Sequence, residues 1–209
     1  MQRFLIVGLI LTLAGSAGAV EKKRRPAGYG TFHQRLALST HLGGGFPTGD
    51  FSNSSLGNAQ AGLVGNMEVE YYFTDYFSLG FDFSTGWFDD EDFSELSSWV
   101  NNYQAFGRFV IPTGGSVSPY GKIGLGVSAL TYKEELPVGT LYSNSDPGMS
   151  LAFGGGMLFR ASNLVSVNLG MGYDVLFLDD SEVEDTGFIV GYDPGYFSIL
   201  FGFSFYLQP

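Results

Sequence analysis

The feature that most constrains this chain is a repeated alternation of apolar residues with small or polar ones. It occurs in eight stretches, and the clearest covers residues 197–207 near the C-terminus. The odd-numbered residues of that stretch are all large and apolar: Phe197, Ile199, Phe201, Phe203, Phe205 and Leu207. Successive side chains of a β-strand point to opposite faces, so each stretch predicts a strand with one apolar face. That face requires an apolar neighbour, which is a second sheet in a soluble sandwich and lipid in a membrane barrel.

The lengths and connections of these stretches favour the membrane barrel. We predict strands at residues 34–43, 62–73, 77–87, 100–111, 119–132, 149–160, 165–177 and 196–207. Strands of about ten residues suit a tilted crossing of an outer membrane. The segments 44–61, 88–99, 133–148 and 178–195 are long and acidic, whereas 74–76, 112–118 and 161–164 are short. This alternation predicts an all-β fold, an eight-stranded antiparallel up-and-down transmembrane β-barrel with both termini in the periplasm.

The N-terminus has the three parts of a secretory signal peptide. Residues 1–19 combine the basic Arg3, an apolar run at 4–14 and the small residues AGA at 17–19. The run is too short to cross a bilayer as a helix. We therefore expect cleavage after Ala19, a periplasmic N-terminal segment at 20–33 and one barrel domain at 34–209. The chain has no Cys, which excludes disulfides, thiol catalysis and Cys-ligated metals.

Charged residues fall in the loops and on the inward strand faces. The long loops are acidic and the formal net charge is −11, which argues against nucleic-acid binding. An eight-stranded barrel is filled by its own side chains, and charges buried there must be paired. The pairs form either a static polar core or a gate that opens a narrow pore. We predict a barrel-interior charge network of four acidic and four basic residues: Glu68, Glu70, Asp82, Asp174, Arg35, Arg108, Lys122 and Arg160.

Three segments resemble small outer-membrane β-barrel domains of the OmpA/OmpX type. They are FPTGDF at 46–51, EYYFTDYFSLG at 70–80 and SPYGKIGLG at 118–126. The resemblance covers residues 34–209 and implies an eight-stranded, porin-like barrel that the barrel-assembly machinery inserts, without a cofactor. Such barrels usually end in an aromatic residue, whereas this chain ends in Leu207-Gln208-Pro209. Nothing follows the last strand, so we expect no periplasmic peptidoglycan-binding domain.

Some eight-stranded outer-membrane barrels modify lipid A, which makes an enzymatic role one alternative. That chemistry needs an activated Ser, a His base and an orienting carboxylate. His41 shares a strand face with Ser39, and Glu68 or Glu70 lies on the next predicted strand. No deacylase-type motif accompanies them, and a lone inward His is more often a polar core residue. We therefore expect no catalytic site.

The acidic loops offer a binding role instead. The runs DDED at 89–92 and DDSE at 179–182 carry the oxygen ligands that Ca²⁺ and Mg²⁺ prefer, or they only keep the surface hydrated. Neither run has the spacing of a calcium loop, so we assign no metal ligands. Apolar residues at 136–142 and 188–190 suit contact with a host or neighbouring-cell surface, or pack within their own loops.

The sequence thus predicts an integral outer-membrane protein, monomeric and surrounded by lipid and lipopolysaccharide. Its expected role is structural or surface interaction, with at most a narrow gated pore. The alternatives are loop binding of divalent cations, lipopolysaccharide or a cell-surface partner, and, less favoured, lipid A modification.

Overall fold

The computed structural model describes residues 35–52, 58–91, 93, 95–137, 139–178 and 194–207. The predicted signal peptide and periplasmic segment lie outside these residues. No helix among the described residues is both long and apolar enough to cross a bilayer. The elements in chain order are β1 (Arg35–Gly49), the 3₁₀ helix η2 (Asp50–Ser52), β2 (Gly62–Tyr72), β3 (Phe77–Asp89), β4 (Leu96–Val110), β5 (Val117–Leu136), β6 (Gly139–Asn144), β7 (Gly148–Arg160), β8 (Val165–Phe177) and β9 (Pro194–Leu207).

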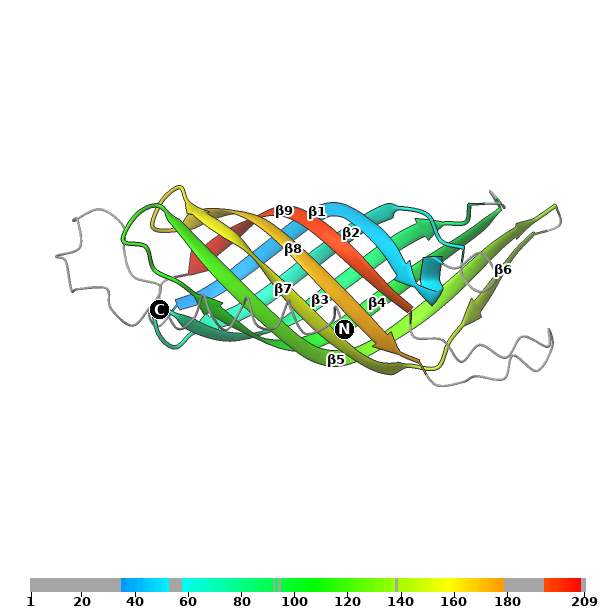
Figure 1. Ribbon diagram of the computed structural model, residues 1–209, viewed down its shortest axis with the longest axis horizontal. Coiled ribbons are helices and arrows are strands. Elements are labelled where there is room, and N and C mark those ends of the chain that lie inside the picture. Colours follow the sequence, from blue (N-terminus) through cyan, green and yellow to red (C-terminus); the bar gives the residue numbers. More distant parts are fainter. Residues whose placement is uncertain are drawn as a thin grey trace, which may run out of the picture.

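Eight of these strands close into an antiparallel barrel (Figure 1). β1 pairs with β2 on one side and with β9 on the other, and β4 pairs with β5 to complete the ring. Neighbours in the ring follow one another along the chain, apart from β6, whose one partner among the described residues is the end of β5. The predicted fold class, an eight-stranded up-and-down barrel, is confirmed.

The two ends of the barrel differ. The connections 73–76, 111–116 and 161–164 lie together at one end, which we call the short-turn end. The opposite end, where β1, β3 and β8 finish, is the long-loop end. There β5 and β6 continue beyond the ring as a projecting hairpin, the β5–β6 hairpin (Figure 1).

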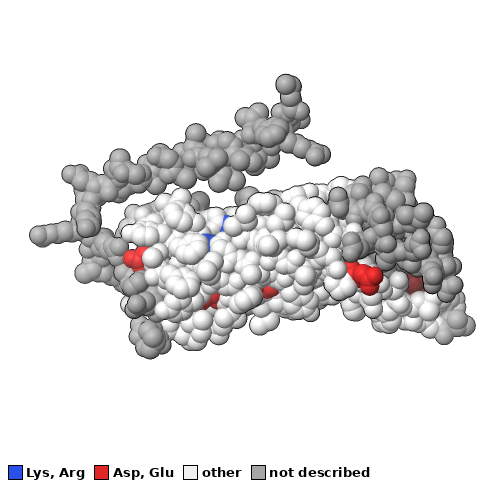
Figure 2. All heavy atoms as spheres, turned by 90° about the horizontal axis from the view of Figure 1, so that it is seen from below, with Lys and Arg blue, Asp and Glu red and all other residues white. Residues whose placement is uncertain are grey.

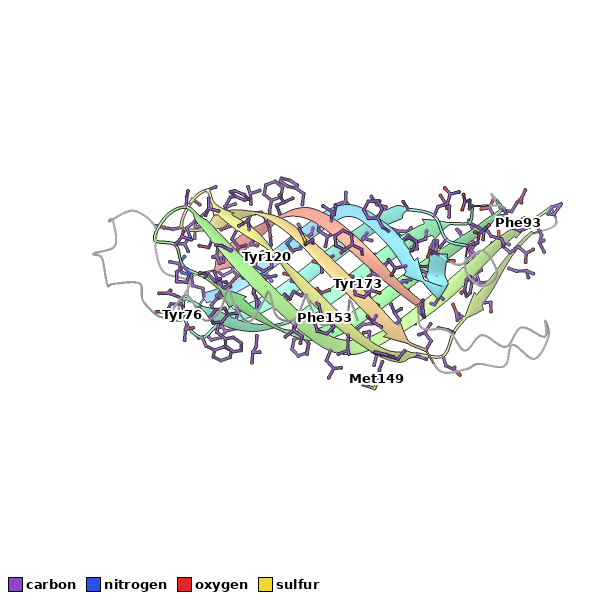
Figure 3. All side chains as sticks on the ribbon, viewed as in Figure 1. Tyr76, Phe93, Tyr120, Met149, Phe153 and Tyr173 are labelled. Carbon is purple, nitrogen blue, oxygen red and sulfur yellow. The ribbon has the colours of Figure 1, made fainter. Side chains whose placement is uncertain are left out.

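The predicted alternation of faces is confirmed along the strands. In β3, Phe81 is 72 % exposed while the next residue, Asp82, is 5 % exposed. β4 follows the same pattern, with Tyr103 and Phe109 outside and Arg108 inside. The outer surface is covered with apolar side chains (Figure 3), and the middle of the face in Figure 2 carries few charged ones. Since lipid is the neighbour that such a surface requires, this belt defines the membrane-facing part of the molecule.

Several strands run further than predicted at the long-loop end. β1 continues to Gly49 and β5 to Leu136, and the predicted loop 88–99 is reduced because β3 reaches Asp89 and β4 begins at Leu96. The predicted loop 133–148 contains β6, which was missed. These boundaries were wrong because the backbone ladder extends beyond the lipid, where nothing requires one face to be apolar.

β6 and β7 follow one another along the same edge of β5, with a break at residues 145–147. At the break the Ser145 N–H donates to the Leu130 carbonyl at 2.8 Å, and the Leu130 N–H donates to Ser145 Oγ at 3.0 Å. Pro147 has no N–H and cannot contribute a ladder bond. A serine side chain therefore takes the place of a backbone carbonyl where the hairpin joins the barrel.

Candidate functional site: the barrel interior

Four adjacent strands, β2 to β5, bring charged side chains together inside the barrel. Glu68 and Glu70 are two residues apart on β2 and so share its inner face. Across the ladders, Glu68 lies opposite Asp82 and Arg108 lies opposite Lys122. The register thus places these five residues side by side; we call them the charge cluster.

Each cation of the charge cluster binds two carboxylates. Arg108 donates to Glu68 and to Glu70, through different guanidinium nitrogens. Lys122 donates to Glu68 Oε1 at 2.6 Å and to Asp82. Burial strengthens these charge-assisted hydrogen bonds. It also means that removing one partner leaves a buried charge without a counter-charge, which strongly destabilises the fold.

Aromatic and neutral groups complete the surroundings of the cluster. The Arg108 guanidinium carbon lies 4.8 Å from the Tyr120 ring centroid, and Lys122 Nζ lies 4.5 Å from that of Phe106. Glu70 also accepts from Ser78 Oγ at 2.7 Å and from the Tyr72 hydroxyl at 3.2 Å. These contacts hold the ion pairs in one geometry, which is typical of a static core.

His41 is held between two amide side chains. Its Nδ1 lies 2.6 Å from Asn66 Oδ1, and Asn168 Nδ2 lies 2.8 Å from its Nε2. A neutral ring protonated on Nδ1 satisfies both contacts, a tautomer assigned here from the partners. Ser39, the nucleophile considered above, instead donates to Ser204 Oγ at 2.8 Å. The Ser–His arrangement needed for acyl chemistry is not formed by these residues.

Of the remaining predicted network residues, Asp174 lines the same cavity as Lys122 and Asp82, whereas Arg35 and Arg160 lie away from the charge cluster. Asp174 on β8 accepts from Gln104 Nε2 at 3.2 Å. Arg35 opens β1 and donates to the Asn163 carbonyl in the turn before β8, while Arg160 closes β7 and is half-buried. Both arginines therefore belong to the short-turn end. We predicted four acidic and four basic residues in one network. The structure places two of the basic residues, Arg35 and Arg160, at the short-turn end instead.

Two apolar layers close the interior on either side of the charge cluster. The layer at the long-loop end consists of Phe51, Val64, Phe88, Val100, Leu130, Leu176 and Tyr196. The layer at the short-turn end consists of Ala37, Tyr72, Val110, Leu158 and Tyr206. Phe51 comes from η2 in the first long loop, is fully buried, and meets the Phe88 ring edge-on with centroids 5.1 Å apart.

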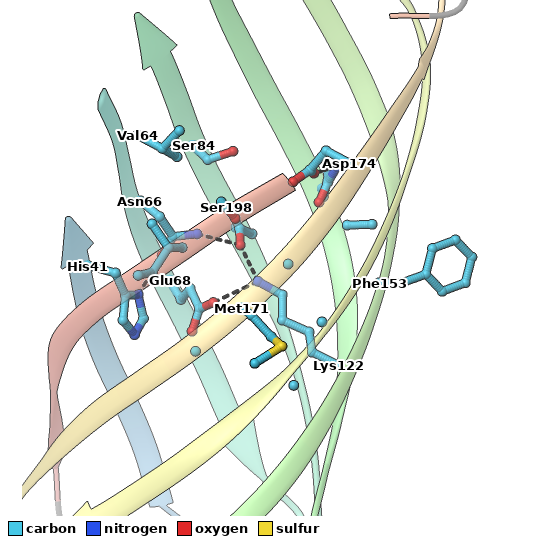
Figure 4. A pocket seen from close by; sticks show the side chains of 18 of the residues that line it. His41, Val64, Asn66, Glu68, Ser84, Lys122, Phe153, Met171, Asp174 and Ser198 are labelled. Carbon is cyan, nitrogen blue, oxygen red and sulfur yellow. Dashed lines mark hydrogen bonds and ion pairs between the residues drawn. The ribbon is translucent and has the colours of Figure 1, made fainter. Parts of the chain in front are cut away.

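Between these layers the interior contains a cavity of about 60 Å³ (Figure 4). Lys122, Asp82 and Asp174 line it, together with Gly154, the ladder partner of Lys122 on β7, and Gly172, which pairs with Gly154 on β8. A cavity of this size and polarity has room for about four water molecules.

The acidic loops are described only in part. Asp90 Oδ1 accepts from the Phe93 N–H at 2.9 Å and from Asn58 Nδ2 at 3.4 Å, so it helps to shape its own loop. The run 179–182 lies outside the described residues. In the described part of the chain, no group of three or more His, Asp or Glu side chains is arranged to hold a metal ion.

A closed ring of strands, a lipid-facing outer surface and a polar interior between two apolar layers define an integral membrane β-barrel. The sequence matches the model of the outer membrane protein beta-barrel domain over residues 7–204, and the chain belongs to this family. It is accordingly a protein of the outer membrane.

Solved structures with the same fold are distant in sequence. Neisserial surface protein A matches with a TM-score of 0.58 at 13% identity, covering 81% of this chain and 96% of that one. The attachment invasion locus protein Ail of Yersinia pestis matches with a TM-score of 0.52 at 15% identity, covering 84% of this chain and 99% of that one. No curated protein matches the sequence.

Sequence reasoning missed the closing role of Phe51 and the amide clamp on His41. The signal for Phe51 was a single large apolar residue in a polar loop, within a segment already noted for its resemblance. For His41, the signal was the inward position of Asn66 and Asn168 on their strands. Neither pattern shows which side chains meet across the barrel.

Proposed function

We propose that the protein is a structural barrel of the outer membrane with a closed interior. The observation that carries this proposal is the pair of apolar layers that cover the charge cluster on both sides. An ion crossing the barrel would have to displace both layers as well as the ion pairs between them. The cavity between the layers is not a continuous path across the barrel.

Conductance of the refolded protein in a planar bilayer tests this function. We expect no discrete openings from the wild type or from a Glu68→Gln/Glu70→Gln variant, with insertion verified by protease protection. Discrete openings in the wild type that change in the variant would instead establish a gated pore lined by the charge cluster.

The β5–β6 hairpin supports surface interaction as a second role. It projects from the ring, and its Leu141 and Tyr142 side chains are 57 % and 58 % exposed. Trp99 lies 6.5 Å from Tyr142, centroid to centroid, which links the hairpin to the barrel wall. Exposed apolar side chains in such a position favour contact with another surface.

The negative charge of the β5–β6 hairpin indicates which kind of cell-surface partner it can bind. A solved structure of Ail contains the heparin analogue sucrose octasulfate. In this chain the hairpin carries Glu134 and Glu135, and its Lys133 is paired with Glu135. We therefore favour an uncharged or cationic cell-surface partner over a sulfated polymer. Adhesion assays with a Leu141→Ser/Tyr142→Ser variant test this role; unchanged adhesion, with normal surface exposure of the variant, would contradict it.

A further inference from the structure

We propose that Trp87, Trp99 and Tyr142 form a binding surface for the sugars of neighbouring lipopolysaccharide. We call these three residues the aromatic platform. The inference goes beyond the closed-barrel role and does not depend on it. Three observations carry it: a row of aromatic rings, polar side chains beside them, and the position of the row next to the lipid-facing belt.

Strand register builds the aromatic platform. Trp87 on β3 lies directly opposite Trp99 on β4, and both residues belong to the outer faces of their strands. Tyr142 on β6 extends the row, with its ring centroid 6.5 Å from that of Trp99. At the long-loop end β3, β4 and the β5–β6 hairpin run side by side (Figure 1). Three aromatic side chains from three strands thus share one face of the barrel wall.

The Trp87 indole extends along the wall. A Cβ at Gly65 on β2 would lie 3.8 Å from Trp87 Cζ3 and 3.9 Å from Trp87 Cη2, so the far edge of the ring covers Gly65. Trp87 is nevertheless 38 % exposed, and Tyr142 is 58 % exposed. The face of an aromatic ring is its electron-rich side. It attracts the C–H groups of a sugar ring, which carry a slight positive charge.

Polar side chains lie beside the rings. Thr131 on β5 is the ladder partner of Trp99, and its Oγ1 donates to Asn144 Oδ1 at 2.8 Å. Asn101 lies two residues after Trp99, on the same outer face of β4. Hydroxyl and amide groups both donate to and accept from hydroxyl groups. Rings for the C–H groups of a sugar and polar groups for its hydroxyls suit a saccharide, whereas an acyl chain uses only the rings.

A polar row separates the aromatic platform from the hydrocarbon region. The last fully apolar row on this side of the belt follows the register through Phe83, Tyr103, Val127 and Met149. The next row towards the long-loop end holds Thr85 opposite Asn101, and Trp87 and Trp99 come after it. Each row is two residues further, about 7 Å along a strand. The rings therefore lie at the level of the polar part of the membrane.

The orientation of the aromatic platform indicates its ligand. The rings are on the wall that continues the lipid-facing belt, so they face the molecules packed around the barrel. The long-loop end is the cell-surface end in the orientation that we infer. The molecules there are lipopolysaccharides, whose sugars follow directly on their acyl chains.

The charge beside the aromatic platform narrows the ligand to neutral sugars. Asp89 lies two residues after Trp87 on the same face of β3. Lys133, opposite Tyr142 in the ladder, is paired with Glu135. The surroundings are thus negative, which disfavours a phosphate group. We assign uncharged sugars of the lipopolysaccharide core to this surface.

Tryptophan quenching gives the first test, because the two tryptophans of the chain are both in the aromatic platform. The wild type is refolded into nanodiscs that contain lipopolysaccharide with a complete core or lipopolysaccharide truncated to lipid A. We expect acrylamide to quench the fluorescence about twofold less efficiently with the complete core, because sugars then cover the rings. Equal quenching would mean that the rings only anchor the barrel at the interface, and would overturn the proposal.

Matched variants locate the sugar. Saturation-transfer NMR measures the binding of core oligosaccharide, freed of lipid A, to the protein in detergent micelles. Trp87→Leu/Trp99→Leu keeps apolar bulk and should bind about tenfold more weakly than the wild type. The control Phe83→Leu/Tyr103→Leu removes an aromatic pair on the same two strands, with centroids 5.1 Å apart, from the apolar row. It should bind within about twofold of the wild type.

Heat-modifiable gel migration verifies folding, and Trp87→Leu alone decides the question if the double variant does not fold. Wild-type binding by the folded tryptophan variant, or equal loss in both double variants, would overturn the proposal. So would a wild type that binds glycans of another cell but not the core oligosaccharide. Both tryptophans lie outside the β5–β6 hairpin, so this result is independent of the adhesion assay.

Discussion

At the scale of single residues, Arg108 compensates two buried carboxylates at once. Glu68 has a second cation in Lys122, whereas the other partners of Glu70 are the neutral hydroxyls of Ser78 and Tyr72. The two glutamates, although adjacent on one face of β2, therefore depend on Arg108 to different degrees.

Replacing Arg108 with Met should lower the free energy of unfolding by about 3 to 5 kcal/mol, because it leaves a buried carboxylate without a counter-charge. Urea unfolding of the micelle-refolded protein, followed by tryptophan fluorescence, measures this change.

Two double variants give the control for this prediction. Arg108→Met/Glu70→Gln should recover part of the loss, since the uncompensated charge is removed with its cation. Arg108→Met/Glu68→Gln should recover less, because Glu70 remains charged and Lys122 loses a partner. Equal recovery in both variants would show that the two glutamates do not differ as described.

At the scale of elements, glycine sets how closely β5, β7 and β8 approach one another. A Cβ at Gly156 on β7 would lie 2.2 Å from the Leu169 carbonyl oxygen and 2.9 Å from the Tyr120 hydroxyl. A Cβ at Gly121 on β5 would meet nothing within 4 Å. The absence of a side chain is therefore a packing requirement at the first position and not at the second.

Gly156→Ala should destabilise the barrel by about 1 to 3 kcal/mol through overpacking. Gly121→Ala should change stability by no more than about 0.5 kcal/mol, as at an ordinary surface position. Unfolding midpoints of the two variants, measured side by side, check this prediction; similar midpoints would contradict it.

The elements also show what the sequence can and cannot predict. Each strand has lipid on one face and packed polar groups on the other, so apolar and polar residues alternate along its sequence. The faces of residues such as Phe81 and Asp82 could therefore be predicted. This two-residue alternation predicts which face of the strand a residue lies on, but not its position along the barrel axis. For that reason Arg35 and Arg160 were assigned to one network with Glu68, although strand register places them at the short-turn end. Strand ends beyond the lipid, including β6, had no such pattern to reveal them.

At the scale of the whole molecule, the two ends should face different compartments. The chain has no Cys, so each single-cysteine variant carries one defined label site. Thr140 in the β5–β6 hairpin and Ser116 in the turn before β5 are both exposed, at opposite ends of the barrel.

A membrane-impermeant maleimide applied to intact cells should label Thr140→Cys and leave Ser116→Cys unlabelled. Permeabilising the outer membrane should then allow both to react. Labelling of Ser116→Cys on intact cells, with Thr140→Cys protected, would reverse the orientation that we infer from the long-loop and short-turn ends.

The break at Ser145 and Pro147 has a consequence for how this surface can vary. Regular pairing with β5 stops at Asn144 and resumes at Gly148, so changes of length at the hairpin tip between Leu136 and Gly139 need not shift the register of β5 against β7. The tip of the β5–β6 hairpin can therefore change in length and sequence, in natural or designed variants, while the strand pairing of the barrel stays the same.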